Sequence, residues 1–264
     1  GLICSVRDIT ERKRMELELR RALEQERELS ELKSRFVTTA SHEFRTPLAM
    51  IMTSSEMLSR YSARMNDEQK EERLLRIQTE VKNMARLLDD VLTVNRSAEA
   101  ASTEFNPMPL NLVGFCREIL EVMRQTDENS HLFTFTYSGV YTTINVDQRF
   151  LRDILTNLLS NAIKYSSPNT EIAVELNCER QQTVIRVRDQ GIGVSEDDQK
   201  RVFEAFHRGR NVGMASGTGL GLTIAKQAAE LHGGTITLTS KPGLGTTFTV
   251  TIPNVVIEDR NYDH

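Results

Sequence analysis

The stretch Ser41-His42-Glu43-Phe44-Arg45-Thr46-Pro47-Leu48 lies inside a long glycine-free segment of this 264-residue chain. It places an imidazole, His42, next to a carboxylate, Glu43, and a proline follows at Pro47. A single histidine on a helix is usually a packed or solvated side chain. Its meaning therefore depends on what the rest of the sequence supplies.

The surrounding residues predict two long helices. Residues 11–60 contain no glycine and one proline, Pro47, and apolar or small residues recur every three or four positions. This spacing predicts an amphipathic helix that would extend ~75 Å at 1.5 Å per residue. After a short break, where Asn66 or Asp67 can cap the next helix, a second helix is predicted over residues 68–96. Its apolar positions are Leu74, Ile77, Val81, Met84, Leu88 and Val91.

Two antiparallel helices with such apolar seams make half of a four-helix bundle, so we expect a homodimer. The alternative is a hairpin that packs on the other domain of its own chain, but it leaves more apolar surface exposed. Residues 1–10 alternate apolar and polar side chains and predict one short strand. That strand would end at a helix cap, either Asp8 or Thr10.

A domain boundary is predicted at residues 98–109, which are rich in small residues and proline. Beyond it, helices are expected at 112–125, 148–165 and 219–232, with a short one after Ser195, and strands at 132–137, 142–146, 171–177, 183–188, 235–239 and 246–252. This order predicts an α+β sandwich in which helices cover one face of a mixed sheet. The polar tail, residues 254–264, is expected to fray.

The composition narrows the classes of function. Charged residues make up 27% of the chain and the net charge is -4, so we expect no nucleic-acid partner. No apolar run approaches the ~20 residues that cross a bilayer, so we expect no membrane contact within this chain. Cys4, Cys116 and Cys178 lack CxxC spacing and predict reduced thiols and a cytoplasmic location. Because the chain opens at Gly1 without a methionine, a membrane anchor in a preceding part is left open.

The predicted helix 148–165 carries an unusual polar face. Asn157, Asn161 and Lys164 share that face by their i, i+4, i+7 spacing. Amide oxygens are hard ligands that suit Mg²⁺, and a lysine supplies a point charge to phosphates. Taken alone, the same pattern also fits an ordinary solvated face.

Two glycine-containing segments follow. Asp189-Gln190-Gly191-Ile192-Gly193 comes after a predicted strand, where a carboxylate can accept a hydrogen bond from an exocyclic amine such as that of adenine. A turn capped by an aspartate is the alternative. Gly217-Thr218-Gly219-Leu220-Gly221 opens a helix, and backbone N–H groups there form a nest for a di- or triphosphate. Neither a Walker A motif nor a Rossmann fingerprint is present.

The segment between the two glycine motifs reads as a lid. It contains the residues Phe203, Phe206, His207, Arg208, Arg210 and Gly213. Aromatic anchors at one end of a basic loop are typical of a mobile lid over phosphates. A surface loop with buried phenylalanines is the alternative.

The order of the segments SHEFRTPL, NLLSNAIKYS, DQGIG, FEAF and GTGLGL resembles the H, N, G1, F and G2 boxes of the sensor histidine kinases of two-component systems. The resemblance covers residues 10–253, and the ordered set is far more specific than any single box. It implies a coiled-coil, dimerisation and histidine phosphotransfer (HisKA) hairpin at 11–97 and a Bergerat-fold ATP-binding (HATPase) domain at 110–253. Residues 1–10 resemble the exit of an upstream PAS-like sensor domain.

The resemblance also implies roles for single residues. His42 matches the phosphoacceptor, Glu43 its hydrogen-bonded partner, and Thr46 the residue that orients water when such enzymes dephosphorylate their partner. Asn161 matches the Mg²⁺ ligand. The implied ATP-binding residues are Asn157, Asn161, Lys164, Tyr165, Asp189, Gly191, Gly193, Arg208, Gly217, Thr218, Gly219, Leu220, Gly221 and Thr246. The implied reaction phosphorylates His42 from ATP and passes the phosphoryl group to an aspartate in the receiver domain of a separate response regulator.

Two rival functions remain open from the sequence. ATP-hydrolysing machines such as DNA gyrase resemble this chain in the asparagine and glycine boxes, but they place a glutamate base four residues before the metal asparagine. Here that position is Asn157. The other rival is a pseudokinase scaffold that dimerises and binds nucleotide, against which the intact His42, Asn161 and Asp189 argue.

Overall fold

The computed structural model describes residues 2–95, 105–127, 130–209 and 218–254. The chain divides into two compact units, Gly1–Met84 and Ala85–His264. The boundary between them lies inside the second long helix, upstream of the linker predicted at 98–109. Within the described residues, no helix combines the length and the apolar character that crossing a membrane requires.

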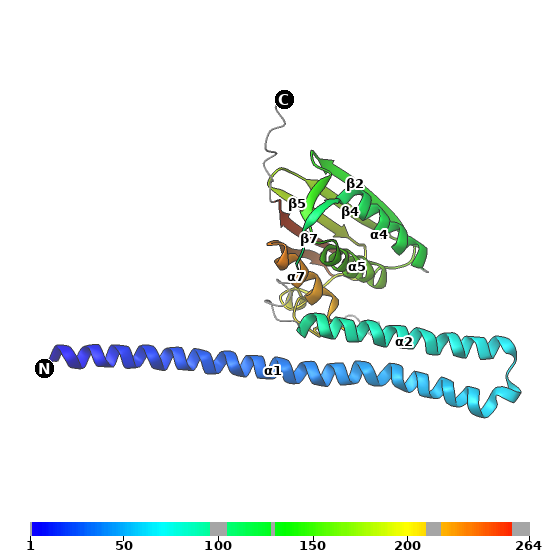
Figure 1. Ribbon diagram of the computed structural model, residues 1–264, viewed down its shortest axis with the longest axis horizontal. Helices are drawn as coiled ribbons and strands as arrows, with labels where there is room; N and C mark the ends of the chain where they lie inside the picture. Colours follow the sequence, from blue (N-terminus) through cyan, green and yellow to red (C-terminus); the bar gives the residue numbers. More distant parts are fainter. Residues whose placement is uncertain (1, 96–104, 128–129, 210–217, 255–264) are drawn as a thin grey trace. The chain divides into compact units, whose positions relative to one another are not determined.

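The first unit is a helical hairpin (Figure 1). Helix α1 spans Leu2–Tyr61, a short 3₁₀ turn, η1, covers Ser62–Arg64, and α2 spans Asp67–Asn95. Asn66 caps α2 as predicted: its side-chain oxygen accepts the Gln69 N–H at 2.8 Å, and the Gln69 side chain accepts the Asn66 N–H at 3.2 Å. This reciprocal pair is a capping box, which satisfies two backbone donors that the helix itself leaves unpaired.

The strand predicted within residues 1–10 is wrong. These residues are helical from Leu2 onward, so neither Asp8 nor Thr10 caps a helix. A lone strand would leave its backbone N–H and C=O groups unpaired, because the described part of this unit contains no other strand. A helix pairs the same groups internally. The PAS-like origin of these residues stays a prediction.

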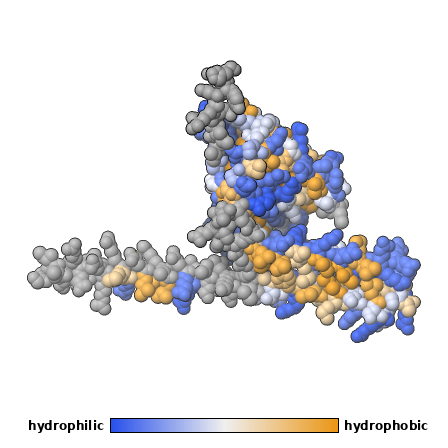
Figure 2. Space-filling model, in the orientation of Figure 1, coloured by the Kyte–Doolittle hydropathy of each residue, from blue (hydrophilic) through white to orange (hydrophobic). Residues whose placement is uncertain are grey.

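The hairpin buries little of its apolar surface. Ala40, Pro47 and Ser54 are buried on α1. In contrast, many large apolar side chains of both helices are 38–62% exposed: Leu48, Met52, Met57, Tyr61, Leu74, Leu75 and Val81. We call these seven residues the apolar face of the hairpin. Figure 2 shows apolar side chains gathered over the hairpin.

The second unit contains the expected order of strands and helices. After α2 it comprises β1 (Met108–Asn111), α4 (Leu112–Thr126), β2 (Leu132–Gly139), β3 (Thr143–Val146), α5 (Gln148–Tyr165), β4 (Glu171–Cys178), β5 (Gln182–Arg188), α6 (Glu196–Gln199), α7 (Gly221–Leu231), β6 (Thr235–Lys241) and β7 (Gly245–Pro253). The predicted elements are found with ends that agree within a few residues. Strand β1 falls partly in the predicted linker and was missed.

The main sheet has five strands in the order β2-β4-β5-β7-β6. Strands β2 and β4 are parallel and the other pairs are antiparallel, so the predicted mixed sheet is confirmed. Helices α4, α5 and α7 lie over one face of this sheet (Figure 1). Strand β1 pairs with β3 in a separate two-stranded sheet. Pro109 is tolerated there because each strand of a two-stranded sheet has a free edge.

Helix α5 joins the core to the site. Its N-cap is Asp147, whose side chain accepts the Arg149 N–H. The buried face of the helix consists of Leu151, Ile154, Leu155, Leu158, Leu159 and Ala162. The 3.6-residue period leaves the asparagines and Lys164 on another face. The core also holds two free cysteines, Cys116 and Cys178, and burial raises the pKa of the Cys116 thiol to about 12.

Candidate functional site

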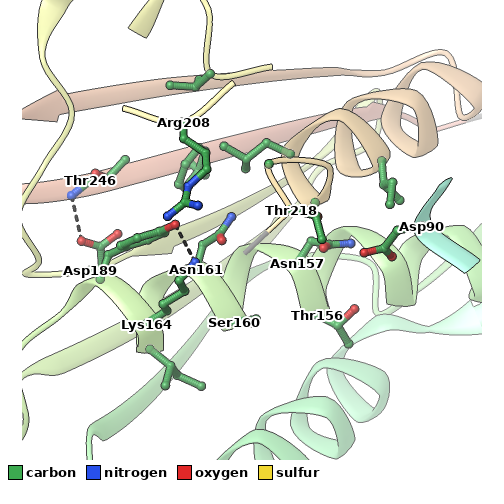
Figure 3. Close-up of a pocket in the computed structure, with 18 of the residues that line it drawn as sticks. Asp90, Thr156, Asn157, Ser160, Asn161, Lys164, Asp189, Arg208, Thr218 and Thr246 are labelled. Carbon is green, nitrogen blue, oxygen red and sulfur yellow. Dashed lines mark hydrogen bonds between the residues drawn. The ribbon is translucent and has the colours of Figure 1, made fainter. Parts of the chain in front are cut away.

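A cavity of about 800 Å³ opens in the second unit. Its walls come from α5, the segment after β5, the start of β7 and the segment leading into α7. The predicted residues that line it are Asn157, Asn161, Lys164, Tyr165, Asp189, Gly193, Arg208, Thr218, Gly219, Gly221 and Thr246. Segments far apart in the sequence are thus brought to one place, as Figure 3 shows. Gly191 and Leu220 do not line the cavity, and Gly217 lies outside the described residues.

Asp189 presents one free carboxylate oxygen. Its Oδ1 accepts the N–H of Gly191 at 2.9 Å and that of Thr246 at 3.1 Å, the latter drawn in Figure 3. Its Oδ2 has no hydrogen-bond partner in the described chain. Burial raises the pKa of Asp189, against the lowering effect of the two backbone hydrogen bonds. The remaining oxygen is therefore an acceptor available to a ligand donor such as an amine.

The glycines after Asp189 allow close backbone packing. A Cβ atom on Gly191 would collide with the carbonyl oxygen of Tyr165, which also accepts the Ile192 N–H at 3.1 Å. Gly193 has φ +67°, and a Cβ atom there would collide with the carbonyl oxygen of Lys241. These contacts fix the segment against α5 and the β6–β7 turn. They explain why side chains larger than hydrogen are excluded here.

The polar residues of α5 differ in their contacts and therefore in their roles. The Asn161 amide makes no hydrogen bond to any described residue and lines the cavity. Asn157, by contrast, donates through Nδ2 to the Asp153 carbonyl at 2.8 Å, and its Oδ1 lies against Gly221. Lys164 Nζ donates to the Tyr165 hydroxyl at 2.8 Å. Asn161 is thus open to a ligand, whereas Asn157 ties α5 to the start of α7.

The N-terminus of α7 faces the same cavity. The Thr218 hydroxyl accepts the Leu220 N–H at 3.1 Å, and Gly219 adopts φ +71°. A Cβ atom on Gly221 would approach the Asn157 Oδ1 to 2.5 Å, so glycine permits this packing of α5 on α7. The Leu220 side chain is 0% exposed and belongs to the core. Backbone N–H groups at such a helix start favour an anion.

The described part of the predicted lid ends at Gly209. Arg208 lines the cavity and its side chain points toward Asn161 (Figure 3). Arg210 and Gly213 lie outside the described residues. The lid as a whole therefore stays a prediction, and so does the contact of Arg208 with a ligand, although Arg208 lines the cavity.

Other cavity residues were missed by sequence reasoning. They include Asp153, Thr156 and Ser160 on α5, together with Arg86, Asp89, Asp90 and Thr93 near the end of α2 within the second unit. Burial raises the pKa of Asp90 to about 6, and the nearby Asp153 and Asp89 add to the shift while Arg86 opposes it. In the sequence these residues read as the charged face of an amphipathic helix, so no signal marked them.

The donor set suits a hard cation held mainly by a phosphate ligand. The described residues contain no group of three or more His, Cys, Asp and Glu side chains placed to hold a metal ion. Asn161 offers a neutral amide oxygen with no competing protein partner. Mg²⁺ takes oxygen ligands and keeps several waters, usually sharing phosphates with its protein. The residues present therefore fit Mg²⁺ bound together with a nucleotide.

The predicted phosphoacceptor lies in the other unit. His42 is exposed on α1 and Glu43 beside it is half-buried. The Thr46 hydroxyl reaches back to the His42 carbonyl at 3.5 Å, so these two residues share one face of the helix. The buried Pro47 lacks an N–H and cannot bond the carbonyl four residues earlier. The imidazole is open to a reaction partner.

Two family models match the chain in consecutive regions. The model described as "His Kinase A (phospho-acceptor) domain" matches residues 32–100. The model described as "Histidine kinase-, DNA gyrase B-, and HSP90-like ATPase" matches residues 146–256. The first region contains His42 and the second contains the residues of the cavity other than those on α2 and α4.

Similar proteins include two sensor kinases. The sensor histidine kinase WalK of Bacillus subtilis is 32% identical over 270 residues, which cover 100% of this chain and 41% of WalK. The sensor protein SrrB of Staphylococcus aureus is 30% identical, with 96% of this chain and 41% of SrrB covered. The chain thus spans about two fifths of the length of these relatives.

Solved structures share the fold. Full-length ShkA, crystallised in complex with AMPPNP, is 26% identical with a TM-score of 0.61, covering 84% of this chain and 46% of ShkA. The histidine kinase ThkA in complex with the response regulator TrrA has a TM-score of 0.65 at 20% identity, covering 86% of this chain and 64% of ThkA. The two family matches and the 32% identity to WalK over the whole chain show that the chain belongs to the sensor histidine kinases of two-component systems.

Proposed function

We propose that this chain is an ATP-dependent histidine autokinase that phosphorylates His42. The observation that carries the proposal is the convergence of Asp189, Asn161 and Lys164 on one cavity that also receives the glycine-rich start of α7. An amine acceptor, a hard-cation ligand and phosphate donors in one space match the parts of a metal–nucleotide complex. A separate exposed imidazole then supplies the acceptor.

Different residues of the cavity contact different parts of the nucleotide. The adenine amine donates to Asp189 Oδ2, because Oδ1 already accepts two backbone N–H groups. The triphosphate lies toward the start of α7, with Lys164 and Arg208 supplying positive charge. Asn161 would hold Mg²⁺, a cation that takes oxygen ligands and is usually bound together with phosphates. When bound, the metal neutralises charge on the phosphates during transfer.

The acceptor step uses the ring of His42. A neutral ring nitrogen donates its lone pair to the γ-phosphorus, and the bond from that phosphorus to the β–γ bridging oxygen breaks, releasing ADP. Glu43 accepts the N–H of the opposite ring nitrogen and stabilises the positive charge that develops. The phosphoryl group then passes to an aspartate in the receiver domain of a separate response regulator. In the dephosphorylation of the partner, Thr46 orients the water that attacks the phosphorylated aspartate of the regulator, which releases inorganic phosphate.

One observation weighs against the rival ATP-hydrolysing machine. Such an enzyme needs a base that activates water, and the family pattern places it at Asn157. This amide bonds the Asp153 carbonyl and packs against Gly221, so it serves to join α5 and α7. An amide is also no base at neutral pH. Transfer to a side chain is therefore favoured over hydrolysis.

The test is autophosphorylation with γ-labelled ATP and Mg²⁺. We expect an acid-labile, alkali-stable phosphoprotein, as a phosphohistidine gives, and complete loss of label in His42→Gln. Nucleotide binding by His42→Gln, measured by calorimetry, should match that of the unchanged protein. Label that survives the substitution would assign the acceptor elsewhere. Binding without any label would favour the pseudokinase scaffold.

A further inference from the structure

A partly buried cluster of Ser195, Asp198 and His207 lies beside the cavity, outside the glycine motifs. The His207 Nε2 is 3.2 Å from Asp198 Oδ1, and the two side chains are each 11% exposed. The Ser195 hydroxyl donates to Asp198 Oδ2 at 2.8 Å and accepts the Asp198 N–H at 3.3 Å. Both carboxylate oxygens are thus engaged, and Nε2 is the ring nitrogen that donates.

This arrangement is not a nucleophilic triad. The carboxylate of Asp198 stands between the serine and the histidine, and the Ser195 hydroxyl donates to it. The imidazole of His207 therefore has no serine proton to remove. The cluster instead ties the segment before Arg208 to the start of α6.

The backbone on both sides of His207 is fixed as well. Phe206 adopts φ +62°, a left-handed conformation, and its N–H donates to the Gly219 carbonyl at 3.0 Å. The His207 N–H donates to the Glu204 carbonyl at 3.2 Å. A Cβ atom on Gly219 would meet backbone atoms of Phe206 at 2.9 Å and the His207 carbonyl oxygen at 3.0 Å. The residues before Arg208 are therefore held by the glycine-rich segment and by the Asp198 carboxylate.

Arg208 follows His207 directly and points into the cavity toward Asn161 (Figure 3). An arginine on an untethered segment loses much side-chain and backbone freedom when it binds a phosphate. A tether that fixes the preceding residue removes part of that loss before the ligand arrives. His207 itself lines the cavity wall next to Arg208.

We propose that the Asp198–His207 pair is a positioning device that holds Arg208 ready to bind the phosphates of the nucleotide. The inference rests on the proposed function, since it assumes that the cavity binds a nucleoside triphosphate. His207 acts through Arg208 and through backbone order, and it takes no part in the transfer step. Ser195 completes the device by occupying the second oxygen of Asp198.

The test measures the affinity of the full chain for AMPPNP with Mg²⁺ by calorimetry, and for adenosine by displacement. We expect His207→Ala to weaken AMPPNP binding about tenfold, the effect of one charge-assisted contact, and to leave adenosine binding unchanged. His207→Gln should recover part of the loss, because its amide can donate to Asp198. Arg201→Ala is the matched control: Arg201 lies in the same segment and forms an exposed ion pair with Glu204.

The double variant gives the decisive comparison. If His207 acts through Arg208, then His207→Ala adds nothing to the loss already caused by Arg208→Ala. A purely structural role would make the two losses additive, and it would also weaken adenosine binding. Either result overturns the proposal, as does an unchanged AMPPNP affinity in His207→Ala. Should His207→Ala not fold, Asp198→Asn in the presence and absence of Arg208→Ala gives the same comparison.

Different results would overturn the proposed function and the positioning role of His207. An unchanged protein that binds no AMPPNP, or that binds it but is not labelled at His42 by γ-labelled ATP, would overturn the kinase assignment itself. Normal binding and labelling by the unchanged protein, with no effect of His207→Ala, would overturn the positioning role alone.

Discussion

At the scale of single residues, the two carboxylate oxygens of Asp189 have different roles: one holds the backbone of the loop, and the other is left for the proposed ligand. Its Oδ1 accepts two backbone N–H groups, and an asparagine keeps that oxygen. Its Oδ2 is the atom left for the ligand, and asparagine replaces it with an NH₂ group. Two donors would then face each other where the adenine amine should bind. The same substitution therefore preserves the loop and removes the recognition.

We expect Asp189→Asn to weaken nucleotide binding by at least a hundredfold, since an unpaired donor replaces a charge-assisted hydrogen bond. Stability should not fall. Burial raises the pKa of Asp189, so its favourable contribution is present below its unfolded pKa of ~3.9 and is lost as pH rises through the folded pKa. At pH 7 the neutral amide should be at least as stable. Calorimetry and thermal melting check both parts; a lower melting temperature with intact binding would contradict the assignment.

At the scale of elements, the turn into α7 depends on a glycine for two reasons. Gly219 has φ +71°, and backbone atoms of Phe206 occupy the space of a Cβ atom. Gly243, in the β6–β7 turn, has φ +76° with no atom within 4 Å of that space. The two positions share the left-handed conformation and differ in packing. They form a matched pair that separates backbone strain from steric exclusion.

We expect Gly243→Ala to cost about 1–2 kcal/mol of unfolding free energy, the penalty for a left-handed alanine. Gly219→Ala should cost more and should also weaken AMPPNP binding, because Phe206 and His207 must shift. Denaturant unfolding and calorimetry measure the two effects. Equal stability losses in both variants, with unchanged affinity, would show that the packing at Gly219 tolerates a methyl group.

The ends of α5 and α7 meet in a hydrogen-bonded cluster that should respond to pH. His232 follows α7, its Nδ1 donates to the Ala228 carbonyl at 2.7 Å, and its Nε2 accepts the Asp147 N–H at 3.1 Å. The ring of Phe105 packs edge-on against the imidazole of His232, with 4.9 Å between the ring centroids. Burial lowers the pKa of His232. A proton on Nε2 would remove the acceptor that Asp147 uses.

The stability that this neutral histidine supplies is present above its unfolded pKa of ~6.5 and is lost as pH falls through the folded pKa. We expect the melting temperature of the unchanged protein to fall more steeply than that of His232→Gln as the pH decreases below about 6.5. The titration of Asp147 does not contribute to the change in stability over this range of pH. Although burial opposes the shift, hydrogen bonds from Arg149 and Asn106 lower its pKa, so its loss occurs at more acidic pH. Parallel pH profiles for the two proteins would contradict the prediction.

The sequence predicts elements well where the signal is local. Helix α5 has its predicted ends at Gln148 and Tyr165, because Asp147 caps it and its apolar period is unbroken. Strand β1 was missed, since its pairing with β3 is long-range and its prolines resemble a linker. The strand expected in residues 1–10 failed because alternation alone does not supply a partner strand.

The residues of the candidate site were likewise predictable where a local sequence motif marks them. Asp189, Asn161 and Lys164 lie in ordered motifs, and the cavity unites them. Asp90 and the pairing of Asp198 with His207 depend on tertiary packing that no motif records. Asn157 differs from these residues, because a motif does mark its position but does not indicate its structural role. The motif marks the residue, but only the structure shows that it packs on Gly221.

At the scale of the whole molecule, the proposed acceptor and the proposed nucleotide cavity belong to different compact units. His42 lies in the first unit, and every residue that lines the cavity lies in the second. The proposed nucleotide binding and histidine phosphorylation can therefore be tested separately. The two units also differ in burial: the second has a buried core, whereas the first leaves its apolar face exposed.

The exposed apolar face of the hairpin predicts a homodimer. Leu74 is 52% exposed and Val81 53% exposed, at positions seven residues apart on one face of α2. Fully burying such side chains is worth about 1.5–3 kcal/mol each, and in a symmetric dimer each position acts twice. We expect Leu74→Glu with Val81→Glu to give a monomer by light scattering and sedimentation, with AMPPNP affinity unchanged. Leu244→Glu, at a residue 74% exposed in the second unit, should leave the dimer intact. An unchanged protein that sediments as a monomer would favour the single-chain hairpin, because no partner would then cover these side chains.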